Sequence, residues 1–308
     1  APFEKTPRDN NYLFKASNRR ISDNNVTIIS KGASLRELIP DYLAPYLAKQ
    51  PGLTDTDWLN TVMKPAPISQ TSLNVTGGSD KSKYAFTMSY FNQKGLVIGT
   101  DYEKFSTSIN LSTELTDKWK VGVTMTPSYA TGTINAAENS RSYNPLQMAT
   151  AMYPFFKPYN DDGSLAISQQ ILGNTATDGA LVENPVAVQE MTNRKYTLFK
   201  TFGNIFTELE LLKGLKYRLS VGGDYSNYEY NFFDPSTVGA YRAAAPDVTF
   251  ANRTEYIRKN YLIENLLSFD RKWGNHRIDA IGGQSFQQED NTQLLTEATG
   301  FPDNSIRN

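Results

Sequence analysis

The sequence predicts an all-β fold, an antiparallel meander of the kind that forms membrane barrels. The clearest evidence is residues 69–113, where apolar and small polar residues alternate. A period of two is the side-chain period of a β-strand, so each run has one apolar and one polar face. The apolar positions are Tyr84, Phe86, Met88 and Tyr90, then Phe105, Thr107, Ile109 and Leu111; the small polar ones are Ala85, Thr87 and Ser89, then Ser106, Ser108, Asn110 and Ser112.

The connections between the expected strands alternate between short and long. A meander with short turns at one end and long loops at the other is typical of an outer-membrane barrel, whereas a soluble sandwich has no reason to sort its loops by length. We expect strands near 69–77, 83–92, 102–113, 118–130, 196–210, 214–230, 256–271 and 276–288. The short connections are 78–82, 114–117, 211–214 and 272–275, and the long ones are 93–101, 131–195, 231–255 and the segment after Glu289.

Strand length and the placement of aromatic residues favour the same fold. Several runs exceed the roughly 5–6 residues usual in soluble sheets and match the roughly 9–11 that cross a bilayer when tilted. Aromatic rings prefer the membrane–water boundary, so rings at strand ends predict two girdles. These rings are Tyr90, Phe91, Tyr102, Phe105, Trp119, Tyr129, Tyr217, Tyr225, Tyr228 and Tyr230.

Composition narrows the function classes. The 308 residues carry 31 basic and 32 acidic side chains, so nothing in the charge balance favours nucleic acid as a partner. There is no cysteine and one histidine, His276, which argues against thiol chemistry, a histidine metal site or a catalytic triad. The mean hydropathy of −0.49 is compatible with a barrel, whose strands are apolar only at alternate positions. The sequence shows neither an apolar stretch of the roughly 20 residues that a membrane helix needs nor a signal peptide.

The chain divides into a leading region, 1–67, with short helices, and a region of about eight barrel strands and their loops, 68–308. In the leading region we expect a strand at 26–29 and a helix that begins at Ser34, with Glu37 completing a capping box. Pro40 and Pro45 should split that helix, and residues 54–59 should form a second, capped short helix. We interpret this region as a structural linker.

The 65-residue connection 131–195 is too long for a bare loop, so we expect it to be folded. Asn144-Pro145 and Asn184-Pro185 each combine an N-cap residue with proline in the first helical turn. The run Asn160-Asp161-Asp162-Gly163 lacks the alternating ligands and terminal glutamate of a calcium loop, so we interpret it as a turn. Apolar residues gather between the two predicted helices, at Tyr153, Phe155 and Phe156.

No catalytic constellation stands out, and we expect no enzyme activity, no metal and no cofactor. The carboxylates are scattered, so choosing two as acid and base would be arbitrary. The glycine pairs Gly77-Gly78 and Gly282-Gly283 lack the lysine and helix of a phosphate loop, and glycine in a strand more often permits a bend. We place His276 at a solvated turn.

Several separated motifs resemble the SusC/RagA family of TonB-dependent outer-membrane transporters, in family order from about Leu53 onward, whereas residues 1–52 match only loosely. The early motifs are Thr56-Asp57-Trp58, Asn74-Val75-Thr76-Gly77-Gly78-Ser79-Asp80-Lys81, Ser89-Tyr90-Phe91-Asn92-Gln93-Lys94-Gly95 and Gly99-Thr100-Asp101-Tyr102-Glu103. Two later hairpin motifs are Glu208–Gly223 and His276–Gln287.

This resemblance implies a transporter of a Bacteroidota-type bacterium that imports oligosaccharides, peptides or similar nutrients. It implies a SusD-like surface lipoprotein as a lid, and the TonB complex as a partner acting through a plug. The sequence shows no plug, TonB box or signal, and about eight strands against the roughly 22 of plugged transporters. Because lipid does not tolerate open sheet edges, we expect an internal segment whose edges pair with the remaining strands of one large transmembrane barrel.

On this hypothesis the two faces of the sheet have different surroundings. Tyr84, Phe86, Met88 and Tyr90 would contact outer-membrane lipid, while Ala85, Thr87 and Ser89 would line the lumen. The extracellular loops, above all 131–195, would contact the lid and a glycan or peptide substrate. The candidate contact residues are Arg141, Tyr143, Tyr153, Phe155 and Phe156, for which an internal loop core is the other interpretation. The alternative function is a secreted, soluble β-sandwich that binds glycans without transport.

Overall fold

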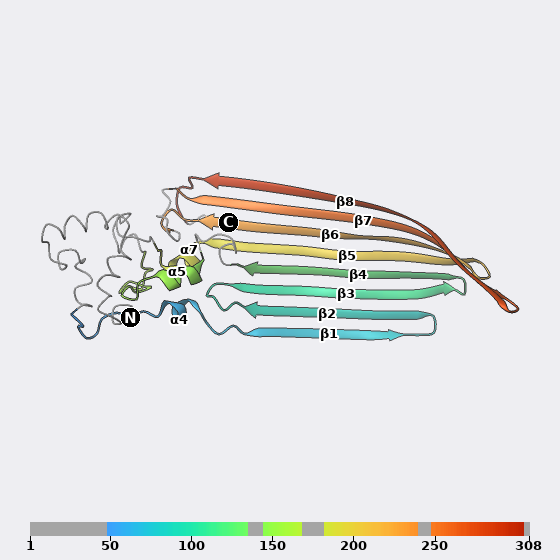
Figure 1. Ribbon diagram of the computed structural model, residues 1–308, viewed down its shortest axis with the longest axis horizontal. Helices are drawn as coiled ribbons and strands as arrows, with labels where there is room; N and C mark the ends of the chain where they lie inside the picture. The colour runs from blue at the N-terminus through green and yellow to red at the C-terminus, as the bar shows by residue number, and fades with distance from the viewer. Residues whose placement is uncertain (1–47, 135–143, 168–181, 240–247, 305–308) are drawn as a thin grey trace, which may run out of the picture.

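The computed structural model describes residues 48–134, 144–167, 182–239 and 248–304. Eight strands form one antiparallel sheet in chain order, and three short helices gather at the end of the sheet where the long connections lie (Figure 1). The strands are β1 (Ile68–Gly78), β2 (Ser82–Lys94), β3 (Asp101–Thr116), β4 (Trp119–Thr133), β5 (Asn193–Leu212), β6 (Leu215–Asp234), β7 (Phe250–Trp273) and β8 (His276–Thr299). The helices are α4 (Trp58–Val62), α5 (Pro145–Ala151) and α7 (Pro185–Met191).

All eight predicted strands are present, and the predicted meander is confirmed. The ladder is antiparallel throughout, with β1 and β8 at its two edges, so the described strands do not close on themselves. The two packed sheets that a soluble sandwich needs are therefore not what these strands form. Two of the short turns use glycine in the left-handed region, Gly214 at φ 85° and Gly274 at φ 55°, where a side chain would be strained.

The strands run farther toward the long connections than the sequence pattern predicted. β8 continues to Thr299, so most of the segment after Glu289 is strand and not loop. β7 likewise begins at Phe250, inside the connection predicted for 231–255. The extension of β8 contains few apolar residues, so the period-two signal fades there although the backbone ladder continues.

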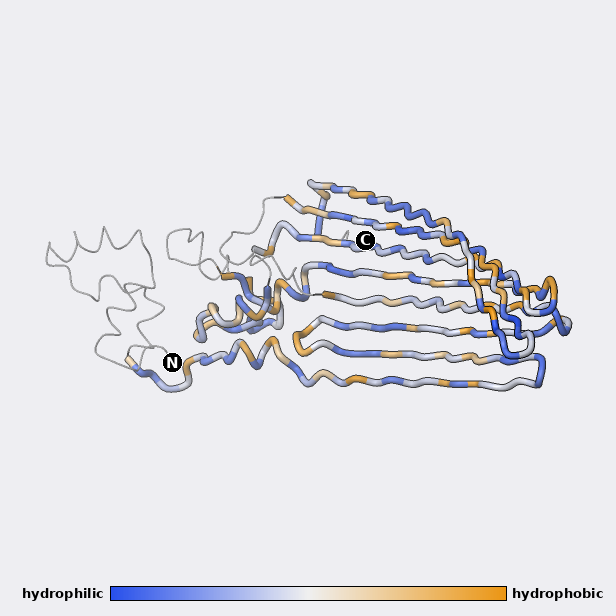
Figure 2. The backbone as a smooth tube through the Cα atoms, turned by 45° about the vertical axis from the view of Figure 1, so that its right-hand side comes forward, coloured by the Kyte–Doolittle hydropathy of each residue, from blue (hydrophilic) through white to orange (hydrophobic). Residues whose placement is uncertain are grey.

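Register gives the sheet one apolar face, because directly paired residues in an antiparallel sheet point the same way. Phe86 pairs with Val75 and Ile109, and Ile109 pairs with Met125, which confirms the alternation in 84–90. Hydrophobic and hydrophilic residues alternate along the tube in Figure 2. We call this the apolar face; its members include Leu73, Val75, Tyr84, Phe86, Met88, Tyr90, Phe105, Ile109, Leu111, Val123, Met125, Tyr129, Phe199, Ile205, Val221, Tyr225, Tyr261, Ile263, Leu267 and Phe286.

The opposite, polar face is organised by the same register. One row of directly paired residues crosses all eight strands and contains five serines and no carboxylate. A face of hydroxyls and amides is stable only where water or another polar partner can reach it. That row is Ser72, Ser89, Ser106, Ser128, Lys200, Ser226, Arg258 and Asn291.

Successive hairpins are staggered along the strand direction. Ser82, the first residue of β2, pairs with Thr113, but β3 continues three residues farther, to Thr116. The same three-residue step separates Leu209 from Leu212 in β5, and a four-residue step separates Phe269 from Trp273 in β7. A regular stagger in one direction is the shear of a barrel whose strands tilt against its axis.

The helices form a small unit with its own apolar core. Its fully buried members come from all three helices and from the connections between strands, for example Val62, Met148, Val186 and Val238. The unit therefore joins segments about 180 residues apart in the sequence, from the leading region to the β6–β7 connection. The predicted strand at 26–29 and the helix that Ser34 begins lie outside the described residues.

Candidate functional site

The end of the polar face nearest the helices is lined with aromatic rings. Tyr102 pairs across Gly132 with Tyr196, which pairs with Tyr230, so three tyrosines stand in one row. The next row contains Phe91, Tyr228 and Tyr256. Ring centroids lie 5.8 Å apart for Phe91–Tyr102, 5.8 Å for Tyr196–Tyr228, 6.3 Å for Tyr228–Tyr256 and 5.8 Å for Phe232–Phe250.

These rings correct part of the girdle prediction. Phe91, Tyr102, Tyr228 and Tyr230 lie on the polar face, opposite the face that carries Tyr90 and Phe105. The reason is parity: neighbours in a strand point to opposite faces, so Tyr90 and Phe91 cannot share one. The polar face therefore ends in a band of rings, which supplies stacking surfaces beside hydroxyl and amide groups.

Farther from the helices than these rings, the polar face has a hollow of about 320 Å³ between β3, β4 and β5. Its lining includes Lys104, Ser106, Ser128 and Lys200, with the ring of Phe202 beside them. Farther along the sheet, side chains of this face are joined across strands, as in Asn204–Ser220 at 2.8 Å and Asn260–Asp224 at 3.0 Å. Polar groups thus extend from the aromatic band well down the sheet.

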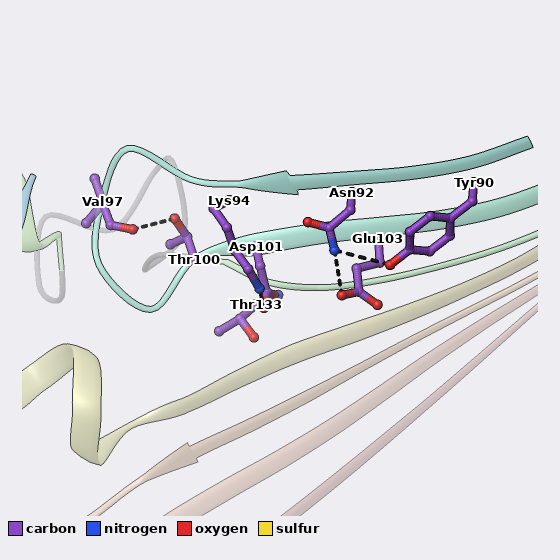
Figure 3. Close-up of polar contacts among 8 residues, drawn as sticks. All are labelled: Tyr90, Asn92, Lys94, Val97, Thr100, Asp101, Glu103 and Thr133. Atoms are coloured by element: carbon purple, nitrogen blue, oxygen red, sulfur yellow. Dashed lines mark hydrogen bonds and ion pairs between the residues drawn. The ribbon is translucent and has the colours of Figure 1, made fainter. Parts of the chain in front are cut away.

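The apolar face becomes polar at the same end, just beyond Tyr90 (Figure 3). Asn92 donates to Glu103 at 2.7 Å and to the Tyr90 hydroxyl at 3.3 Å, and Lys94 lies 3.4 Å from Asp101. Asp101 also accepts from the Thr133 backbone amide at 2.9 Å. The ring of Tyr90 therefore marks the boundary between the apolar belt and a polar rim, which is the arrangement expected at a membrane–water interface.

Each helix of the small unit begins at a side chain that the sequence identified. Asp57 accepts from the Asn60 amide, Asn144 from the Leu146 and Gln147 amides, and Asn184 from the Val186 amide. Proline follows both asparagines in the first turn, where its missing N–H costs nothing. The predicted caps at Asn144 and Asn184 are confirmed, and so is the capped short helix predicted within 54–59.

Two buried polar residues hold the helical unit together. Asn184 is fully buried, and its Nδ2 donates to the carbonyls of Pro158 at 2.7 Å and Ala166 at 2.8 Å. Glu183 is 3% exposed, and it accepts from the amides of Asn184 at 2.8 Å and Gly239 at 3.0 Å. These bonds fix the 158–166 segment and the β6–β7 connection against α7.

Three of the five predicted contact residues lie together in this unit. Tyr153, Phe155 and Phe156 form a ring cluster, with centroids 5.0 Å apart for Tyr153–Phe155 and 4.7 Å for Phe155–Phe156. Phe156 is buried and the other two are partly buried against the core, the arrangement of an internal loop core. Arg141 and Tyr143 lie outside the described residues.

Outside this cluster, the described residues show little that resembles a reaction centre. In the exposed turn Asn160–Gly163, the Ser164 hydroxyl and amide lower the pKa of Asp162, and Gly163 takes φ 84°. Burial and a hydrogen bond to Glu190 raise the pKa of Tyr159. Among the described residues no three acidic or histidine side chains cluster as metal ligands, and none of the described helices has the length and apolar character needed to cross a membrane.

Comparison with known proteins places this geometry among TonB-dependent barrels. No family model matches the chain. It is 28% identical over 261 residues to TonB-dependent receptor P3 of Formosa agariphila, covering 83% of this chain and 25% of that receptor. It is 27% identical over 254 residues to TonB-dependent receptor P26 of the same organism, covering 80% of this chain and 24% of the receptor. The chain thus spans about a quarter of the length of these relatives.

Solved structures agree on the fold. The RagAB peptide transporter matches with a TM-score of 0.63 at 18% identity, over 82% of this chain and 28% of the transporter chain. The 'closed-closed' RagAB peptide importer matches with a TM-score of 0.65 at 19% identity, over 85% and 29%. The chain is thus similar in sequence to TonB-dependent receptors and in fold to the RagAB barrel. An apolar face and sheared strands are features of the wall of an outer-membrane β-barrel.

Proposed function

We propose that the segment forms part of the wall and the outer loops of a transporter that imports nutrients across the outer membrane. The observation that carries this proposal is the two-faced sheet: one largely apolar face, and one face of serine, threonine and amide groups that ends in aromatic rings. A wall with lipid on one side and a water-filled passage on the other needs this division. Tyr84, Phe86, Met88 and Tyr90 then contact lipid, and Ala85, Thr87 and Ser89 line the passage.

The substrate class that we propose is an oligosaccharide, a peptide or a similar nutrient. Stacked tyrosines beside hydroxyl and amide groups suit sugar rings, and they also suit the side chains and backbone of a peptide. The RagAB structures are named as a peptide transporter and a peptide importer, which supports a peptide as the substrate. The relatives and structural neighbours are named as receptors and transporters, and we propose that the protein is not an enzyme.

The partners that we propose follow from the two ends and two edges of the sheet. The edges β1 and β8 pair with the remaining strands of the same barrel, because open edges are not stable in lipid. The helical unit and its ring cluster, together with Arg141 and Tyr143, face a SusD-like lipoprotein lid and the incoming substrate. TonB drives the transporter through a plug, in keeping with the names of the relatives.

The experiment that tests this function is nutrient depletion by the native bacterium. The gene that encodes the full-length protein is deleted and restored in single copy, and cells receive defined mixtures of oligosaccharides or of peptides. Mass spectrometry of the medium should show one class persisting in the deletion strain and disappearing on complementation. Equal depletion of both mixtures with and without the gene would reject the transport proposal.

A second test addresses the two faces directly. The chain contains no cysteine, so within it a single introduced thiol reports one position. Ser108→Cys on the polar face should react with a small water-soluble maleimide in intact cells, whereas Ile109→Cys on the apolar face should react only after detergent extraction. Reaction of both thiols in intact cells would contradict the assignment of Ile109 to lipid.

A further inference from the structure

The hollow on the polar face is chemically unlike the rest of that face. Lys104 of β3 and Lys200 of β5 stand on either side of β4. Ser106 and Ser128 lie in the paired row of Lys200, and Lys104 lies one pair closer to the aromatic rings. The side chains around the hollow are cationic, hydroxyl-bearing or apolar, and no carboxylate lines it. Two ammonium groups on the same face, separated by one strand, repel each other unless an anion lies close to both.

Several other cations on this face have carboxylate partners within the sheet. Arg258 lies 3.3 Å from Glu289, and Lys216 lies 3.5 Å from Glu208. Within the described ranges, no carboxylate lies within 4.0 Å of the Lys104 or Lys200 ammonium group. The positive charge of the hollow is therefore available to a ligand.

The hydroxyl groups around the hollow fall into two kinds. Thr126 and Ser128 donate back to the carbonyls of Phe202 and Lys200, so their hydrogens are committed. Ser108 instead accepts from Asn110 at 3.2 Å, which leaves its own hydrogen free to donate. Ser106 is level with Lys200 in the paired row, and Ser108 lies one pair farther along β3 from Lys104. Both line the hollow with the lysines, where a hydroxyl can add a charge-assisted hydrogen bond to an anion.

We propose that this hollow binds an anionic group of the transported ligand, a carboxylate or a sulfate, through Lys104, Lys200, Ser106 and Ser108. The inference rests on the proposed function, because it assigns this face to the passage, and it narrows the substrate to acidic oligosaccharides or acidic peptides. A volume of about 320 Å³ holds one charged unit and not a whole chain. The ring of Phe202, 47% exposed, provides a stacking surface for the remainder of that unit.

The test is competitive lysine acetylation of the full-length protein in detergent, read by peptide mass spectrometry. Sulfate is compared with chloride at equal ionic strength, so that general screening cancels. With a Kd of about 10 mM, about 20 mM sulfate occupies two thirds of the sites and slows labelling of Lys104 and Lys200 about threefold. Lys83, which lies on the same face near the short turns, serves as the internal control and should not change.

Two variants separate binding from bulk electrostatics. Ser106→Ala with Ser108→Ala removes both free donors and should abolish most of the protection, while Thr126→Val removes a committed hydroxyl and should leave it intact. Protection of Lys83 together with the hollow would overturn the proposal. So would slow labelling of Lys104 and Lys200 in every condition, because another part of the protein would then already cover them.

The two ligand sources are distinguished by repeating the protection with trigalacturonate and with triglutamate, against the neutral maltotriose and trialanine. Either acidic probe alone should protect at concentrations below those of sulfate, and it identifies the source. Protection by the neutral probes to the same extent would overturn the proposal. Equal nutrient depletion with and without the gene, together with protection of Lys104 and Lys200, would count against import only, so the two hypotheses fail separately.

Discussion

The sheet and the helical unit are stabilised in opposite ways. Among the described residues, only Ala130 and Phe233 of the buried hydrophobic side chains lie in strands, and the others belong to the helices and connections. The sheet instead leaves large side chains such as Leu73, Ile205 and Phe286 exposed on one face, at 59%, 64% and 57%. The helical unit thus folds like a small soluble domain, whereas the sheet has no core and needs an apolar medium outside it.

This difference shows which interactions stabilise each region. In the helical unit, removing apolar area from water stabilises the packing of α4, α5 and α7, at about 25 cal/mol per Å². In the sheet, the backbone ladder supplies the order and the surrounding lipid supplies the apolar environment. Substitutions should therefore depend on the bilayer in one region and on water in the other.

The largest expected effect is an arginine on the apolar face. Phe86→Arg should cost about 2–4 kcal/mol of folding free energy near the bilayer centre, because a charge must leave water for hydrocarbon. Thr87→Arg, one residue along on the polar face, is the matched control and should be far milder. Urea-dependent folding of the full-length barrel into lipid vesicles measures both values, and equal losses would reject the assignment of the faces.

The next effect belongs to the helical unit. Asn184→Ala removes the amide that donates to the Pro158 and Ala166 carbonyls, and it also removes the N-cap of α7. It should destabilise the unit by about 2–4 kcal/mol. Asn144→Ala removes only an exposed cap and should cost about 1 kcal/mol. Hydrogen exchange of the 182–191 amides in the full-length protein reports the loss. Because the unit folds apart from lipid, the cost should be the same in detergent and in vesicles, and a dependence on the lipid would contradict the comparison.

Much of the sheet was predictable because its signal is local. The alternation around Phe86 and Ile109, the short turns and the caps at Asn144 and Asn184 each depend on a few neighbouring residues, and all are confirmed. The part of β8 after Gln287 was not predictable, since it is mostly polar and its two leucines, Leu294 and Leu295, are adjacent and point to opposite faces, so no period of two can be detected.

The candidate site was only partly predictable, because it depends on register between distant strands. The rings of Tyr102 and Tyr228 looked like girdle residues by position, and only the pairing across β4 and β5 places them on the polar face. The packing of Phe156 on the unit's core likewise requires contact with a segment 100 residues away, at Thr56, whose hydroxyl donates to the Phe156 carbonyl at 2.6 Å.

A smaller loss of stability, at Trp58, tests whether the helical unit behaves as a small soluble domain. Trp58 is buried at 3% exposure, and its indole N–H donates to the Tyr153 carbonyl at 2.8 Å. Trp58→Phe keeps an aromatic ring but leaves the Tyr153 carbonyl only the Phe156 amide, 3.3 Å away, so it should cost about 1 kcal/mol. Exchange of the 145–152 amides measures it, with Leu59→Ala on the exposed side of the same helix as a control near zero. A larger loss from Leu59→Ala would indicate that this side is covered in the assembled protein.

The smallest effect is a pH dependence confined to the exposed turn at Asn160–Ser164. The pKa of Asp162 is lowered from its ordinary 3.8 by the Ser164 hydroxyl, at 2.6 Å, and by the Ser164 amide, at 2.9 Å. A lowered pKa means that the ionised carboxylate stabilises the turn, so this contribution is complete above the ordinary value and is lost as the pH falls through the lowered one. Exchange of the Ser164 amide, corrected for its intrinsic pH dependence, should therefore lose protection below about pH 4 in the wild type. Asp162→Ala should remove that dependence and leave the exchange of the 185–191 amides unchanged, because the turn lies at the surface of a unit whose order comes from its buried core. If the protection of the α7 amides instead falls together with that of the turn, the turn and α7 unfold as one cooperative element. The helical unit would then be less like an independent soluble domain than its core indicates.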